Sequence, residues 1–162
     1  MMSATCGKLL VFVVIAMTFL PGCEDARREP TETVTIRGQS WVVELADTAD
    51  LRYRGLSDRE SLPAGRGMLF IFPYPERLDF CMRQCLIPLD IAFIDSDMRV
   101  VRMCTMEVEP YGLHEKEYSS IVPAQYALEV SKGALAAAGV QVGDLVEFSA
   151  NMPPAAKAEP SP

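Results

Sequence analysis

The stretches RGLSDRESLPAGRGMLFIF (residues 54–72) and FCMRQCLIPLDIAFID (residues 80–95) decide the fold that we expect for this chain. The first contains the apolar run Met68–Phe72, and the second contains the largely apolar run Leu89–Asp95. Such runs, bounded by Gly and Pro, are typical of buried β-strands. One acid, Asp90, stands inside the second run. The two stretches therefore predict a core of short strands with a carboxyl group placed in it.

Strand patterns also precede these stretches. Thr33–Arg37 and Trp41–Ala46 flank the Gly-containing tripeptide GQS, which predicts a β-hairpin. A short helix should follow, capped by Asp47 or Thr48 and ended by Gly55. The first third of the folded region is thus a hairpin followed by a helix.

The remaining elements are also short. Pro73 and Pro75 should end the strand that begins at Met68. A second short helix should begin with Ser131 as its cap and end at Gly139. Many short strands with one or two short helices favour a mainly β fold, an antiparallel β-sandwich or a barrel-like (jelly-roll-like) sheet. The further expected strands are Leu78–Cys85, Leu89–Asp95, Arg99–Met106, Gln125–Val130 and Val142–Phe148.

The first residues match the pattern of an export signal. The apolar segment Leu9–Leu20 follows Lys8 and is shorter than the roughly 20 residues of a membrane span, so residues 1–22 are predicted to be a signal peptide. Gly22 directly precedes Cys23, as in a bacterial lipoprotein box. We therefore expect a lipid on Cys23 that anchors the exported chain to the membrane of the cell envelope, facing the periplasm or the exterior. An uncleaved anchor and simple secretion remain the alternatives.

Composition completes the expected layout. Residues 23–32 are charged and read as a tether, residues 33–150 as the β-domain, and residues 151–162 as a disordered Pro/Ala-rich tail. The chain has 22 acidic and 15 basic residues and a formal net charge of −7. Nucleic acids and anionic lipids favour basic surfaces, so neither is an expected partner of the domain.

Several motifs resemble the bacterial and archaeal family called domain of unknown function number 192. This resemblance implies a compact, mostly antiparallel β-sandwich that is often exported or lipid-anchored, and it implies no established activity. The motifs are Arg54-Gly55-Leu56, Leu62-Pro63, Gly65 to Phe70, Ile87 to Ile91, Phe93-Ile94-Asp95, Ala127 to Val130 and Val142-Gly143-Asp144.

The chain departs from the family pattern at three places. Where relatives usually read Phe-Trp-Met-Lys-Asn-Thr, residues 80–85 read FCMRQC. The usual Asp-Gly turn is Asp97-Met98, which requires another turn type or a strained methionine. A common Pro-Cys pair is Pro110-Tyr111. Any ligand role of the replaced residues is therefore in doubt here.

Three cysteines follow Cys23. On an extended strand, Cys81 and Cys85 would lie four rises of about 3.3 Å apart, beyond the ~7 Å Cα separation of a disulfide. They could pair only if the chain bends between them. Counting back across the Asp95–Arg99 turn places Cys104 near Leu89 or Asp90. Small buried apolar residues, a disulfide, and a thiol or metal site all remain open. The methionines and His114 could add soft ligands, but no CxxC or HxxxH spacing organises them, and we expect no cofactor.

The charged residues offer further candidates. A buried Asp90 needs partners, and it is either a structural acid, clamped by an arginine or satisfying a turn, or a ligand-contacting acid. Its candidate arginine partners are Arg54, Arg66, Arg83 and Arg102. Arginines beside Gly-rich turns could also grip a carboxylate or phosphate, or could simply be solvated. His114, in the long polar stretch Glu107–Ser120, could act as a base or a metal ligand.

The sequence favours a non-enzymatic binding or interaction module over an enzyme. No Ser/His/Asp arrangement is recognisable, whereas polar residues gather in loops. The expected partner is an unknown small ligand or envelope protein, held in a cleft floored by residues 80–90 and rimmed by residues 54–67 and the His114 loop. The residues expected to bind it are Arg54, Arg66, Arg83, Asp90 and His114. The alternatives are a thiol/metal protein or enzyme using Asp90 with Cys81, Cys85 or Cys104, and a purely structural envelope factor.

Overall fold

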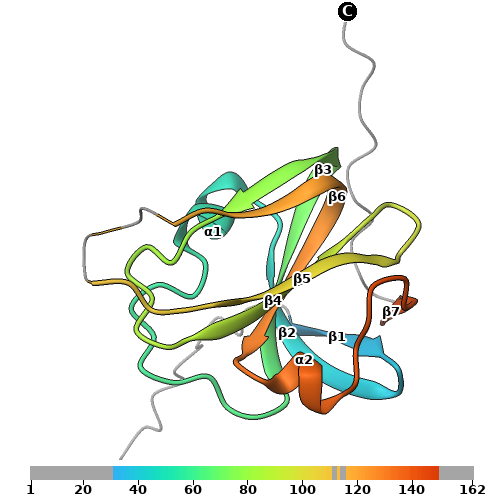
Figure 1. Cartoon of the computed structure of the whole chain (residues 1–162), viewed down its shortest axis with the longest axis horizontal. Helices are drawn as coiled ribbons and strands as arrows, with labels where there is room; N and C mark the ends of the chain where they lie inside the picture. Colours follow the sequence, from blue (N-terminus) through green and yellow to red (C-terminus); the bar gives the residue numbers. More distant parts are fainter. Residues whose placement is uncertain (1–30, 111–112, 114–115, 150–162) are drawn as a thin grey trace, which may run out of the picture.

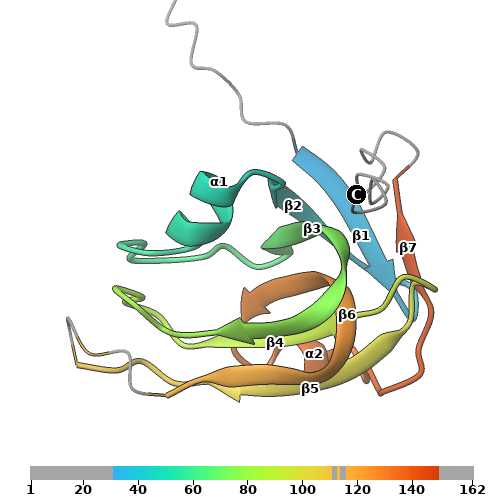
Figure 2. The ribbon, with the colours of Figure 1, turned by 90° about the horizontal axis from the view of Figure 1, so that it is seen from above.

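Seven strands form one curled sheet in the order β5-β4-β6-β3-β2-β1-β7 (Figures 1 and 2). The structure is a computed structural model, and it describes residues 31–110, 113 and 116–149. The mainly β, barrel-like prediction with two short helices is confirmed. The elements are β1 (Thr31–Ile36), β2 (Gln39–Ala46), α1 (Ala49–Arg54), β3 (Arg66–Phe80), β4 (Leu89–Ile94), β5 (Val100–Met106), β6 (Tyr118–Ser131), α2 (Ala134–Ala137) and β7 (Val146–Phe148).

One pair of strands departs from the antiparallel expectation. β2 and β3 run parallel, with Val42 opposite Arg66 and Ala46 opposite Phe70. The connection between them contains α1 and a long loop, which carries the chain back to the starting end of β2. A bridge between Arg99 and Leu145 then joins the β4–β5 turn to the segment before β7, so the sheet curls toward closure at this corner (Figure 2).

The hairpin, the helix cap and the helix stop predicted at the start of the domain are confirmed, but the hairpin turn lies one residue earlier than the predicted GQS tripeptide, and Gln39 and Ser40 belong to β2. β1 and β2 pair as a hairpin, and Arg37 and Gly38 both have positive φ (53° and 79°), as a two-residue turn of type I′ requires. Thr48 caps α1 by accepting a hydrogen bond from the backbone N–H of Leu51. Gly55 ends the helix, with φ of 50°.

The prediction that Pro73 and Pro75 end a strand is wrong. β3 continues to Phe80, and its register against β6 jumps between Ile71 and Glu76. The two prolines lie in this irregular segment, where no backbone N–H is needed for the ladder, so the strand tolerates them. The separate strand expected at residues 78–85 is the last part of β3 followed by a turn.

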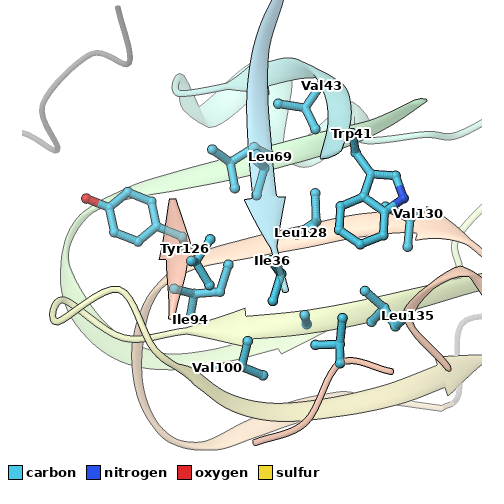
Figure 3. Close-up of a cluster of buried hydrophobic side chains, with 14 of the residues drawn as sticks. Ile36, Trp41, Val43, Leu69, Ile94, Val100, Tyr126, Leu128, Val130 and Leu135 are labelled. Atoms are coloured by element: carbon cyan, nitrogen blue, oxygen red, sulfur yellow. The ribbon is translucent and has the colours of Figure 1, made fainter. Parts of the chain in front are cut away.

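Both faces of the central strands are covered. Along β6, Leu128 and Val130 belong to a cluster with β1, β2, β7 and α2, and Figure 3 shows ten labelled members of this cluster. Ala127 belongs to the cluster on the other face, with residues of β3, β4 and the loop after α1. Alternation along the strand places Glu129 on the same face as Ala127. This double burial explains why the central strands read as apolar runs.

The β4–β5 hairpin corrects a register prediction. Asp95 Oδ1 accepts hydrogen bonds from the backbone N–H groups of Asp97 and Arg99, and Met98 has a positive φ of 61°. A bulge between Phe93 and Ile94 shifts the pairing by one residue, so Cys104 lies opposite Ile91 rather than Leu89 or Asp90. Among the described residues, no helix is long and apolar enough to cross a membrane.

Candidate functional site

A cleft of about 350 Å³ lies on the sheet face that carries Ala127 and Glu129. Four segments meet there: α1 with the loop that follows it, β3, the turn after β3, and β6. The cleft brings together four candidates from the sequence, Arg54, Cys81, Arg83 and Cys85. Its other lining residues include Arg52, Tyr53, Gly55, Leu56, Ser57, Phe70, Phe72, Asp79, Phe80 and Glu129.

Glu129 is the buried acid of the cleft. It is 5% exposed, and among the described residues no hydrogen bond or ion pair to its carboxyl group is found. Its oxygens are not completely enclosed, because the fully buried side-chain polar atom without a partner among these residues is Arg102 Nε. Burial raises its pKa from 4.5 to about 8, so the carboxyl is largely protonated at neutral pH. Sequence reasoning did not select this residue. The signal was present, because Glu129 interrupts the apolar run QYALEV just as Asp90 interrupts the run in β4.

Two arginines beside the cleft are held in place by backbone carbonyls. Arg52 donates to the carbonyl oxygens of Asp47 (2.7 Å) and Ile71 (2.8 Å), and its guanidinium lies 5.0 Å from the ring centroid of Phe72. Arg83 donates to the carbonyl oxygen of Tyr53 (3.0 Å) and lies 3.9 Å from the centroid of the Tyr53 ring. The cleft therefore has fixed positive charges next to aromatic surface.

Phenylalanines provide the apolar wall of the cleft. Phe80 makes edge-to-face contacts with Phe70 and Phe72, with ring centroids 4.9 and 6.3 Å apart. Phe80 also contacts Phe93 of β4 at 5.7 Å, which ties the wall to the core. Such pairs add stabilisation beyond the area they bury, so this wall is a rigid part of the fold.

The chain bends between Cys81 and Cys85. The backbone N–H of Cys85 donates to the carbonyl of Met82 at 3.2 Å, and Gln84 has a positive φ of 56°. The extended geometry assumed for this segment is therefore wrong, and the turn brings both cysteines to the cleft. Cys81, Cys85 and Cys104 are all free thiols. In the part of the chain that the structure describes, no three His, Cys, Asp or Glu side chains are arranged to hold a metal ion.

Cys85 is a thiol that resists ionisation. Burial, followed by the nearby negative charges of Glu129 and Cys81, raises its pKa from 9.0 to about 12. Burial also raises the pKa of Cys104 on β5. A thiol must ionise to act as a nucleophile, so Cys85 is poorly suited to nucleophilic chemistry at neutral pH.

Thiol labelling of the native protein should therefore distinguish Cys85 from a cysteine whose thiol has its ordinary pKa. At pH 8 we expect a roughly thousandfold smaller thiolate fraction for Cys85 than for a cysteine with its ordinary pKa, and correspondingly slow reaction with a disulfide reagent. Half-buried Cys81 should react faster. The time course of labelling in Cys85→Ser, Cys81→Ser and wild-type protein measures this, with urea-unfolded protein as the control. Labelling of native Cys85 at the rate of the unfolded chain would contradict the expectation.

Asp90 does not line the cleft. Its carboxylate accepts hydrogen bonds from the Thr105 hydroxyl (2.8 Å) and from the backbone N–H groups of Gly133 (2.8 Å) and Leu135 (3.3 Å). No described arginine forms an ion pair with it. Asp90 thus caps α2 in place of the predicted Ser131, whose hydroxyl donates to the Leu62 carbonyl. These contacts support the structural interpretation, an acid that satisfies a turn, while a ligand role for Asp90 stays a prediction.

The other candidates lie apart from the cleft. Arg66 lines a second groove, of about 460 Å³, beside α2. Arg59 forms a bidentate pair with Glu44, with one hydrogen bond of 2.6 Å, and this contact lowers the pKa of Glu44. His114 and Cys23 fall outside the described residues, as do the signal peptide, most of the tether and the C-terminal tail.

The fold and the cleft define a small mainly β domain with an acid and two fixed arginines on one face of its sheet. Residues 32–148 match the model of the family DUF192 (Uncharacterized ACR, COG1430), and the chain belongs to this family. A search of curated proteins found no match.

Two crystal structures are similar to the chain. One, described as a suggested transcription regulator from Sinorhizobium meliloti, is 30% identical with a TM-score of 0.67, and the match covers 74% of this chain and 95% of the other. The second is a protein of unknown function from Novosphingobium aromaticivorans. It is 33% identical with a TM-score of 0.66, and the match covers 72% of this chain and 84% of the other.

Proposed function

We propose that this domain is a non-enzymatic binding module that holds a small organic molecule in the Glu129 cleft. The unpartnered carboxyl of Glu129 carries the proposal. A buried polar group without a hydrogen-bond partner is costly, and a ligand that supplies the partner removes this cost on binding. The volume of about 350 Å³ lies at the lower end of the range for small-molecule sites.

The chemistry of the cleft favours binding over catalysis. The raised pKa of Cys85 keeps its thiol protonated at neutral pH. Arg52 and Arg83 are held against backbone carbonyls and aromatic rings. Guanidinium groups held in place in this way are suited to binding a negatively charged group of a ligand. The transcription-regulator description of the Sinorhizobium structure does not favour DNA binding here, because the net charge of −7 opposes contact with phosphates.

The location of the module is proposed from its first residues. The apolar segment followed by Gly22 and Cys23 favours export and lipid attachment at Cys23, with membrane anchoring through that lipid. Mass spectrometry of the native protein from membranes tests this. A mature chain that begins at Cys23 and carries acyl mass supports anchoring, and an unmodified chain that retains residues 1–22 contradicts it.

Binding is tested with a thermal-shift and calorimetry panel of sugars, organic acids, amines, amino acids and short peptides. We expect at least one class to bind wild-type protein, and Glu129→Leu to weaken that binding at least tenfold, since leucine removes every polar atom of the side chain. Glu76→Leu, at an exposed position of β3, is the matched control. A flat response to the whole panel, or equal binding by Glu129→Leu, would contradict the proposal.

A further inference from the structure

We infer that the ligand of this cleft is a small zwitterion of the amino-acid type, whose ammonium group meets Glu129 and whose carboxylate meets the arginines. This inference rests on the proposed binding function and names the ligand class. It follows from two features of the cleft. One favours a positive group on the ligand, and the other favours a negative group on the same molecule.

The first feature is the acid. Glu129 has no partner among the described residues and lies beside the phenylalanine wall. A buried carboxylate is stabilised best by a cation that also donates hydrogen bonds, and an ammonium group has three donors. Aromatic rings attract cations as well, so Phe70, Phe72 and Phe80 add to the same preference.

The second feature is the fixed positive charge. Arg52 and Arg83 cannot turn away from the cleft freely, because each is bonded to a backbone carbonyl and stacked on a ring. Two guanidinium groups repel a simple amine and attract a carboxylate. An anion without an amine would leave an ionised Glu129 without a positive partner. A zwitterion satisfies both ends, and the cleft volume fits a single amino acid or a compact analogue.

Because Glu129 titrates, the affinity for the ligand should depend on pH, and the direction of the change can be predicted. The charged and titratable groups that line the cleft with Glu129 are Arg52, Tyr53 and Arg54 from α1, Asp79 from β3, and Cys81, Arg83 and Cys85 from the turn. Binding of an ammonium group requires ionised Glu129, whose pKa in the free protein is about 8. Affinity should therefore rise up to about tenfold per pH unit from pH 6 toward 8 and then level off. A ligand that accepts a hydrogen bond from the protonated carboxyl shows the opposite sign, with affinity falling above pH 8.

Isothermal titration calorimetry on the full chain tests the inference. The probes are L-leucine, L-phenylalanine and 6-aminohexanoate, each compared with isoamylamine and 4-methylpentanoate, which keep only one of the two charges. We expect at least one zwitterion to bind tenfold or more tightly than both single-charge probes. Its binding should release a proton near pH 7, detected as a dependence of the heat on the ionisation enthalpy of the buffer.

Single substitutions test which side chain binds the ammonium group of the ligand and which binds its carboxylate. Glu129→Gln keeps hydrogen-bonding capacity but cannot ionise, so it should weaken zwitterion binding at least tenfold at pH 8 and abolish the rise with pH. Arg83→Gln should weaken binding of the zwitterion and leave the amine unaffected or slightly improved. Glu76→Gln and Arg99→Gln, at exposed positions, are the matched controls and should change neither.

The outcomes distinguish the two proposals. If sugars or organic acids bind through Glu129 while zwitterions do not, the binding function stands and the ligand class is wrong. If zwitterions bind with an affinity that is flat or falling between pH 6 and 8, the ammonium–Glu129 contact is wrong. If nothing in the panel binds, both proposals are wrong.

Discussion

Relative to the variant Glu129→Gln, the wild-type protein is expected to lose on the order of 4 kcal/mol of unfolding free energy as the pH rises from 4.5 to 8. The cause is the carboxyl group buried at the cleft. Its pKa in the folded state, about 8, lies above its ordinary value of 4.5, because burial disfavours the charged form.

The sign follows from proton binding. Between these two pKa values the folded state holds the Glu129 proton and the unfolded state does not, so the stability contributed by the protonated acid is fully present below pH 4.5. It is lost as the pH rises, by about 1.4 kcal/mol per unit, until the folded pKa is passed. Glutamine cannot ionise, so the variant lacks this slope.

Urea denaturation of both proteins at half-unit steps from pH 4.5 to 9 measures the difference. Comparing slopes rather than single values removes the constant cost of a buried glutamine amide. Glu76→Gln, at an exposed position on β3, should follow the wild-type curve. Parallel curves for wild type and Glu129→Gln would show that the acid is ionised or solvated in the folded protein, and the site would need another explanation.

Replacing Asp90 by alanine should destabilise the domain by about 3–5 kcal/mol at pH 7. The substitution removes the acceptor of three hydrogen bonds, and it leaves the N–H groups of Gly133 and Leu135 at the start of α2 without the carboxylate. Hydrogen bonds to a charged acceptor contribute more than neutral ones, and buried donors left unsatisfied add a further cost.

Urea denaturation at pH 7 measures this loss, and Asp97→Ala in the exposed β4–β5 turn is the matched control, which should change stability little. A second variant, Asp90→Asn, keeps one acceptor oxygen and should lose less than alanine. If Asp90→Ala were as stable as Asp97→Ala while losing ligand binding, Asp90 would be a binding residue rather than a cap. If stability falls and the remaining folded protein binds normally, the structural role is established.

Much of the fold could be predicted because its signals are local. The β1–β2 hairpin, the cap of α1 at Thr48 and the end of α1 at Gly55 depend on neighbours a few residues away, and the apolar runs in β3, β4 and β6 identify buried strands directly. The wrong predictions concern features that are set by contacts between segments far apart in the sequence. The passage of β3 through Pro73 and Pro75 depends on an irregular register with β6, and the cap of α2 comes from a carboxylate on β4.

The candidate site shows the same limit. Arg54, Cys81, Arg83 and Cys85 were selected from the sequence and do lie together. Glu129 was missed because an acid in an apolar strand indicates burial but says nothing about whether it has a partner. Asp90 gives the same sequence signal and is fully hydrogen-bonded, so the two acids could be told apart only by their surroundings.

The sequence by itself determined the class of fold and the positions of most strands, since these depend on hydrophobic periodicity and turn chemistry along the chain. Its motifs also indicated the family by resemblance. Only the tertiary structure decided that β2 and β3 run parallel and that the turn after β3 lies beside α1. It also decided that Glu129 faces this meeting point without a partner. These facts depend on which strands are neighbours and in which register, and a one-residue shift would turn Glu129 to the opposite face of the sheet.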